Sequence, residues 1–193
     1  MESSLTKIKK HLKLLVENTF LEFDKSYHND TPYAFFVRVS PEGNSVYTLM
    51  LSEDQLSDIA KHYSTNEKEI LNAEYFSLLR QSLRWAIGEQ WYVLDNDLLK
   101  DVNLLILNAM ENGEIELFDG VVENICLEVL ESLQKQKFFL HNFQSIVIGL
   151  TYRSESDEEF LNWIQKINSL EIVEQVKQEL SAMYAAQKLI ESR

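Results

Sequence analysis

The sequence predicts an α+β fold, in which a small antiparallel or mixed sheet packs with about six to seven helices. Three segments, at residues 33–40, 45–52 and 145–151, are rich in the β-branched and aromatic residues that favour strands. Most of the remaining chain has apolar residues at spacings of three and four, as in an amphipathic helix. Because the chain has only five Gly and two Pro and no linker or repeat, we expect a single domain over residues 1–193.

The three strand segments are expected to form one sheet. Residues 33–40 (YAFFVRVS) and 45–52 (SVYTLMLS) are separated by a short Pro- and Gly-containing turn, which predicts an antiparallel hairpin over residues 33–52. Residues 145–151 (SIVIGLT) are apolar at successive positions, as in a central strand covered on both sides or a strand buried at one end. We expect this segment to pair with the hairpin.

Helices are predicted on both sides of these strands in the chain. Residues 4–23 form the first expected helix, with Ser4 as its N-cap. A Ser followed three residues later by Gln or Glu has capping-box spacing, which predicts helix starts at Ser52 and Ser156. Helical periodicity also covers the ranges 66–85, 95–112, 122–133 and 173–183.

Charge is the most informative bulk property of the chain. It has 31 Asp and Glu against 18 Lys and Arg, a formal net charge of −13, and eleven of the acidic residues but one base fall within residues 89–131. Nucleic-acid binding draws its affinity from clustered Lys and Arg, so this distribution argues against a nucleic-acid role and favours a basic protein partner. The acidic face expected to dock that partner comprises Asp97, Asp101, Glu123, Glu128 and Glu131.

The sequence indicates a cytoplasmic protein. Its one cysteine, Cys126, excludes an internal disulfide framework, and a Lys-rich stretch stands near the N-terminus where a secretory peptide needs an apolar core. The longest apolar stretches, such as residues 102–110, are much shorter than the roughly 20 residues of a membrane-spanning helix. We therefore expect no membrane span.

No common motif of catalysis occurs, and the sequence predicts no catalytic residue, cofactor or metal. There is no Gly-rich phosphate loop, nucleophile elbow or His-Glu-x-x-His pair. The four His residues lack a ligand at metal-binding spacing, and Cys126 lies on the apolar stripe of its helix, as an inert buried thiol does. Asp95, Asn96, Asp97 and Asp101 present several oxygens to a hard cation, but a helix cap by Asp95 with Asp97 near the positive helix end accounts for them as well.

A second constellation is aromatic. Arg84, Trp85, Glu89 and Trp91 are a candidate ligand-binding group, because an arginine and a carboxylate beside tryptophan rings can orient a planar or cationic ligand. The structural alternative is an Arg–Glu pair buried under two core tryptophans. We expect Trp85 and Trp163 to be mostly buried and to serve packing.

Three parts of the sequence carry a resemblance to a known family. They are YAFFVRVS with the strand after it, the Arg84-Trp85 pair with Glu89 and Trp91, and SIVIGLTYRSESDEEFLNWIQKINSLEIVE, which contains Ile167-Asn168. Together they resemble domain-of-unknown-function family 4303 over nearly the whole chain. The resemblance implies an α+β fold in a bacterial cytoplasmic protein, and it brings no established activity or catalytic residue.

Two classes of function remain. The first is a non-enzymatic binding protein whose acidic face docks a basic partner, and an immunity-type protein that neutralises a toxin is one concrete version. The second is a small-ligand-binding protein or an enzyme that uses the region from Arg84 to Trp91. The charge distribution and the missing enzyme motifs favour the first class, whereas the partner, any substrate and the oligomeric state do not follow from the sequence.

Overall fold

The predicted α+β class is confirmed by the structure, a computed structural model. It describes residues 2–26, 30–66, 73–86, 92–93, 96–141, 146–151 and 156–192. Within these ranges the chain forms seven α-helices, one short 3-10 helix and a four-stranded mixed sheet. The expectation that residues 1–193 form one domain stays a prediction.

The elements follow one another in an alternating order. The strands are β1 (Pro32–Val39), β2 (Val46–Ser52), β3 (Tyr92–Val93) and β4 (Val147–Thr151). The helices are α1 (Ser4–Ser26), α2 (Glu53–Asn66), α3 (Ala73–Leu83), α4 (Asp97–Glu111), α5 (Val121–Lys135), the 3-10 helix η1 (Phe138–His141), α6 (Asp157–Ile167) and α7 (Leu170–Glu191). None of the helices in the described ranges combines the length and the apolar character needed to cross a bilayer.

The sheet contains the predicted hairpin and the predicted third strand. Its order is β3-β2-β1-β4, with β1 antiparallel to β2 and parallel to β4. The strand at 147–151 pairs with the hairpin as expected, and it is buried at all five positions although β1 is its one strand neighbour in this sheet. This strand is therefore at the end of this sheet rather than central, and α5 and α6 pack against it. The two-residue strand β3 was not expected from the sequence.

Two asparagine side chains form hydrogen bonds with strand backbone groups, in the place that a neighbouring strand would otherwise take. On β4, the Ile148 N–H donates to Asn168 Oδ1 at 3.0 Å, and Asn168 Nδ2 donates to the Ile148 carbonyl at 2.6 Å. At the start of β2, the Val46 N–H donates to Asn103 Oδ1 at 2.8 Å, and Asn103 Nδ2 donates to the Val46 carbonyl at 3.2 Å. Each amide thus supplies the donor and the acceptor of one missing strand residue.

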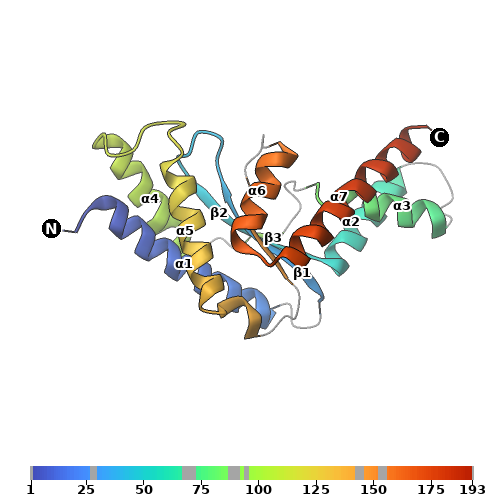
Figure 1. The fold of residues 1–193 in the computed structure, drawn as a ribbon, viewed down its shortest axis with the longest axis horizontal. Coiled ribbons are helices and arrows are strands. Elements are labelled where there is room, and N and C mark those ends of the chain that lie inside the picture. The colour runs from blue at the N-terminus through green and yellow to red at the C-terminus, as the bar shows by residue number, and fades with distance from the viewer. Residues whose placement is uncertain are drawn as a thin grey trace.

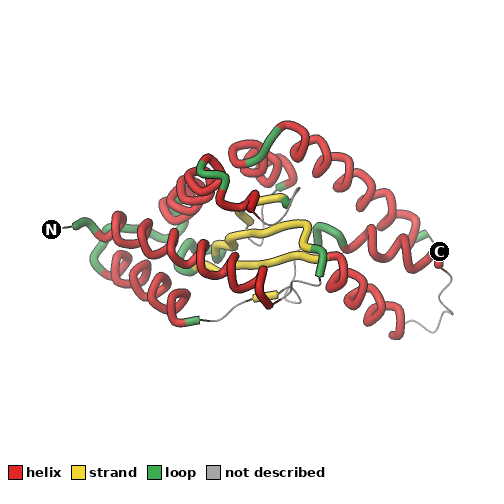
Figure 2. Tube along the Cα trace, turned by 90° about the horizontal axis from the view of Figure 1, so that it is seen from below, coloured by secondary structure: helices red, strands yellow, loops and turns green. Residues whose placement is uncertain are grey.

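Helices cover both faces of the sheet. Phe35 and Val37 of β1 belong to an apolar cluster with α1, α4 and α5, and Ala34 and Phe36 belong to a second cluster with α2, α6 and α7. This alternation follows from the period of two in a strand. Figure 1 shows α1, α4 and α5 at one end of the molecule and α2, α3 and α7 at the other. Figure 2 shows the strands enclosed by helices.

Two predicted helix caps are one residue off. The first helix begins at Ser4, and the Ser3 hydroxyl accepts from the Thr6 N–H, so Ser3 takes the role predicted for Ser4. Asn96, rather than Asp95, caps α4 by accepting from the Leu99 N–H. Asp95 itself lies outside the described residues. Ser, Asp and Asn all suit the N-cap, so the residue type alone does not show which of two neighbours caps the helix.

The capping box predicted from Ser156 is present. The Ser156 hydroxyl accepts from the Glu159 N–H, and the Glu159 carboxylate accepts from the Ser156 N–H. The Ser52 hydroxyl likewise accepts from the Gln55 N–H at 3.2 Å at the start of α2.

Candidate functional site

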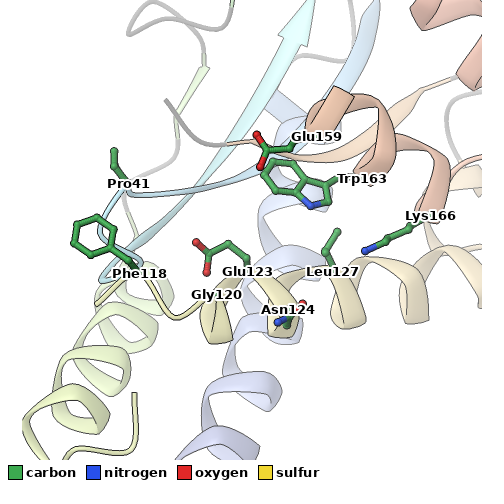
Figure 3. Close-up of a pocket in the computed structure, with 9 residues that line it drawn as sticks. All are labelled: Pro41, Phe118, Gly120, Glu123, Asn124, Leu127, Glu159, Trp163 and Lys166. Carbon is green, nitrogen blue, oxygen red and sulfur yellow. The ribbon is translucent and has the colours of Figure 1, made fainter. Parts of the chain in front are cut away.

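A pocket of about 470 Å³ lies where four parts of the chain meet. They are the β1–β2 turn, the loop between α4 and α5, the first half of α5, and α6. We call it the α5–α6 pocket, and its lining residues are Pro41, Phe118, Gly120, Glu123, Asn124, Leu127, Glu159, Trp163 and Lys166. Figure 3 shows Pro41 and Phe118 at one end, Lys166 at the other, and the Glu123 carboxylate and the Trp163 ring between them. Its volume is within the range of about 300–1,000 Å³ that small-ligand sites occupy.

The loop before α5 is held in a defined conformation. Asp119 accepts hydrogen bonds from the backbone N–H groups of Glu116 and Val121, at 2.8 and 2.9 Å. The Phe118 N–H donates to the Glu42 carbonyl of the β1–β2 turn at 3.3 Å. Phe118 has a φ of 64°, in the left-handed region that non-glycine residues rarely adopt. Its ring is nevertheless 71% exposed, so packing does not explain the conformation.

Glu123 is the acidic residue at the floor of this pocket. It projects from the first turn of α5, where the positive end of the helix dipole favours a carboxylate. Its Oε2 atom is buried and accepts no hydrogen bond from the described residues. The carboxylate also lies against Gly43, where an added Cβ would stand 3.9 Å from Oε2. A buried carboxylate oxygen without a donor is uncommon, because it loses hydration without replacement.

Helix α6 supplies the opposite side of the pocket. Glu159 is engaged in the capping box with Ser156. Trp163 lies one turn further along α6, is partly buried, and packs against the apolar cluster of α1, α4 and α5. Lys166 is exposed, and its ammonium group extends toward the pocket in Figure 3. The pocket therefore combines an aromatic wall, two carboxylates and one cation.

Arg84 and Trp85 lie elsewhere, among α2, α3 and α7. Arg84 Nη1 contacts Glu53 Oε1 at 2.6 Å, and Arg84 Nε contacts Glu179 Oε2 at 2.9 Å. The guanidinium group also stacks over the Tyr33 ring, 4.3 Å from its centroid. Trp85 is buried, as expected, and makes edge contacts with neighbouring aromatic rings.

The electrostatics of this group are those of a closed network. Burial opposes the charge of Arg84, but hydrogen bonds to Glu179 and Glu53 outweigh it and raise the pKa of the guanidinium group. Burial also raises the pKa of Tyr33, whose hydroxyl donates to the Arg84 carbonyl at 2.7 Å. The guanidinium group and the backbone carbonyl of Arg84 thus both have partners within the protein. These contacts favour the structural interpretation of Arg84 and Trp85, while Glu89 and Trp91 lie outside the described residues.

The five residues of the predicted acidic face are divided between two helices. Asp97 and Asp101 lie on α4, and Glu123, Glu128 and Glu131 lie on α5, while α1 packs against both helices. Glu123 enters the α5–α6 pocket.

The remaining members of the predicted face are on the surface, and three of them have a lysine nearby. Glu128 pairs with Lys9 of α1 at 2.7 Å. Glu131 pairs with Lys135 at 3.3 Å, and Asp97 contacts Lys100 at 3.6 Å. Such exposed pairs contribute little to stability and are weakened by salt.

Neither the oxygen-rich group around Asn96 nor the cysteine forms a reactive centre in what the structure describes. Asn96 is engaged as the cap of α4, and no group of three His, Cys, Asp or Glu side chains among the described residues has the arrangement of a metal site. Cys126 is fully buried, and burial together with the Glu123 charge raises the pKa of its thiol. A thiol of this kind stays protonated and unreactive near neutral pH.

Comparison with known proteins places the chain in a family. The family model described as Domain of unknown function (DUF4303) matches residues 12–169. The chain belongs to this family. The DUF4303 match begins within α1 and ends at residue 169, one residue after the Asn168 that supports β4. No curated protein and no solved structure matches the chain.

The sequence did not predict the α5–α6 pocket of this DUF4303 protein. Glu123 was singled out for its charge, and Trp163 was assigned to packing, but Phe118 and Lys166 attracted no interpretation. The available signal was local: a Phe within an acidic loop (EIELFDG) has no helical or strand period that would bury it.

Proposed function

We propose that this protein is a non-enzymatic binding protein whose acidic surface docks a basic protein partner. The observation that carries the proposal is the segment from Asp97 to Glu131, which holds nine carboxylates and one base, Lys100. Seven of the nine are exposed, and they are Asp97, Asp101, Glu111, Glu114, Glu116, Asp119 and Glu128. An immunity-type protein that neutralises a toxin is one concrete version of this function.

The carboxylates of this segment differ in whether a cation or a hydrogen-bond donor compensates their charge. Asp101, Glu111 and Glu116 have no cationic or hydrogen-bonding partner in the described part of the chain. Glu114 accepts from the Ser4 hydroxyl, and Asp119 is occupied by backbone N–H groups of its own loop. Helix α4 and the loop after it therefore provide the uncompensated charge, which produces a negative field that steers a cationic partner.

The second candidate function, a ligand site or active site at Arg84 to Trp91, has less support. Glu53 and Glu179 occupy the guanidinium group of Arg84, and Trp85 is 6% exposed. A ligand at this place would have to displace ion pairs that are part of the fold. We also propose, from the sequence, that the protein acts in the cytoplasm.

Affinity capture from the native cell, followed by binding kinetics with the captured protein, tests the proposed function. The variant is the double reversal Asp101→Lys with Glu116→Lys, and its matched control is Glu174→Lys with Glu191→Lys on α7. Both change the net charge equally, but only the first alters the acidic segment. We expect a basic partner whose association slows about tenfold at low salt in the first variant alone.

The opposite result is easily recognised. If the captured protein is not basic, or if both double variants bind it at the rate of the wild-type chain, the acidic segment does not dock it. Thermal melting of each variant excludes unfolding as the cause of a lost interaction.

A further inference from the structure

We propose that the α5–α6 pocket receives the guanidinium group of an arginine side chain. The inference rests on the proposed function, because it assigns the place where a basic partner inserts one of its cationic residues. Four observations carry it: a buried carboxylate oxygen without a donor, a half-open aromatic wall, a loop held in a rarely used conformation, and the distribution of charge along the pocket.

The first observation concerns Glu123. Its Oε2 atom is buried and accepts no hydrogen bond from any residue that the structure describes. A buried acceptor left in this state is destabilising, and a ligand that donates to it removes the penalty. A guanidinium group donates two parallel N–H groups to a carboxylate, so it satisfies both oxygens of Glu123 once the carboxylate turns and Oε2 moves from the Gly43 side into the pocket.

The second observation is the aromatic wall. Trp163 is partly buried and lines the pocket together with Glu123, and Figure 3 shows its ring between the Glu159 and Lys166 side chains. The planar guanidinium group stacks on such a ring while its edge remains free for hydrogen bonds. An ammonium group lacks this flat face, and the pocket therefore selects arginine over lysine.

The third observation is the Phe118 loop. Phe118 is 71% exposed at a φ of 64°, and hydrogen bonds from the loop to Asp119 and Glu42 hold it there. Unfavourable backbone conformations that persist without a packing reason cluster at ligand sites. The ring closes one end of the pocket and gives the aliphatic part of an arginine side chain an apolar surface.

The fourth observation is the direction of the charge. Glu123 and Glu159 face one ammonium group, that of Lys166, which stands at the far end of the pocket in Figure 3. Among the lining residues, carboxylates outnumber ammonium groups by two to one, which favours a cationic ligand over an anion. A cation binds at the Glu123 end, away from Lys166, which weakens its binding by repulsion.

The test is an NMR titration of the full chain with N-acetyl-arginine amide. The control ligand is N-acetyl-citrulline amide, which has the same shape without the charge. The Trp163 indole N–H reports occupancy of the pocket. We expect saturable shifts with a dissociation constant on the order of millimolar for the arginine compound, as befits a ligand of few atoms, and none for the citrulline compound.

Three variants separate the pocket from the general field of the protein. Glu123→Gln is compared with Glu128→Gln, which removes the same charge from the same helix but from a residue paired with Lys9 outside the pocket. We expect Glu123→Gln to lower affinity for the arginine compound about tenfold, the effect of losing one charged hydrogen-bonded contact, and Glu128→Gln to change it less than about twofold. Lys166→Gln should raise affinity about two- to threefold, because it removes a repulsive charge.

Each outcome bears on one statement. Equal binding of citrulline, equal effects at Glu123 and Glu128, or weaker binding in Lys166→Gln would each overturn the arginine assignment. The proposed function is judged separately, by the charge reversals at Asp101 and Glu116 on partner binding. A pocket that binds the arginine compound in a protein whose partner ignores those reversals would keep the site and refute the acidic docking surface.

Discussion

The two helical ends of the molecule use carboxylates in opposite ways. Among α2, α3 and α7, Glu53 and Glu179 are partly buried and enclose Arg84, while Arg80 adds a contact of 2.7 Å to Glu53. Among α1, α4 and α5, most carboxylates point to water, and the partly buried Glu123 has one buried oxygen without a donor among the described residues. Charge is compensated inside the fold at one end and left available at the other.

This difference shows why a count of charges does not locate a binding surface. Glu53 and Glu179 belong to the same acidic total as Asp101 and Glu116, yet an arginine within reach makes the first two structural. Paired, partly buried charges fix how helices pack, whereas unpaired exposed charges act at a distance on a partner. The first kind should therefore affect stability when mutated, and the second should affect association.

The largest expected effect is at the compensated end, in the variant Trp85→Ala. Trp85 is 6% exposed and packs on Tyr33, Phe36 and Phe160, so its removal leaves a cavity that the sheet and helices cannot fill. We expect the free energy of unfolding to fall by about 3–5 kcal/mol. Urea unfolding of the wild-type chain and the variant measures this difference in free energy.

Trp163→Ala is the comparison for this prediction. Because Trp163 is only partly buried and lines the pocket, its replacement should cost less stability than that of Trp85. If the two variants lost the same free energy of unfolding, the distinction between a packing and a pocket tryptophan would fail.

A smaller loss is expected from Arg84→Met, which keeps an unbranched but shorter side chain and removes its charge. Glu53 and Glu179 would then be left close together without the cation that joins α2, α3 and α7. We expect a loss of about 1.5–3 kcal/mol in the free energy of unfolding, the range for hydrogen bonds to charged groups.

Arg80→Met provides the matched control, since Arg80 contacts Glu53 but not Glu179 in the described contacts and is more exposed than Arg84. The free energy of unfolding should fall clearly less in Arg80→Met than in Arg84→Met. If Arg84→Met left the free energy of unfolding unchanged but abolished the binding of a ligand, the functional site would instead lie at this end of the molecule.

The smallest effect, at most about 1.4 kcal/mol per pH unit for each group, concerns alkaline pH, where each end holds one buried group. Burial raises the pKa of Cys126 above its ordinary value of 9.0 and that of Tyr33 above 10.0. The folded protein therefore keeps these protons at a pH where the unfolded chain loses them. Their contribution to stability is complete below the ordinary pKa of each group and falls as pH rises above it.

The measurement is urea unfolding between pH 8 and pH 10.5, a window chosen around the two ordinary values. Each group adds a slope of up to about 1.4 kcal/mol per pH unit once its unfolded form ionises. In Cys126→Ala the decline should begin near pH 10 instead of pH 9. A wild-type profile that is flat over this window would contradict the burial of both groups.

The sequence by itself determined most of the helices and strands and the pairing of the third strand with the hairpin. The hairpin at 33–52 and the third strand followed from β-branched and aromatic runs, and the Ser156 capping box followed from a spacing of three residues, because these signals are local. The burial of Cys126 followed from apolar periodicity, and that of Trp85 from the expectation that a tryptophan serves packing. Even the family was recognisable from the sequence, and its model matches residues 12–169.

Tertiary structure alone decided what each charged and aromatic side chain contacts. Arg84 meets Glu53 and Glu179, which lie 31 and 95 residues away along the chain. Asn168 completes β4 across 20 residues. The α5–α6 pocket joins a turn, a loop and two helices that no sequence period connects. Local patterns report which face of an element is apolar, but the partner of a polar group depends on how distant elements pack, and that packing produces both the closed network at Arg84 and the unsatisfied carboxylate at Glu123.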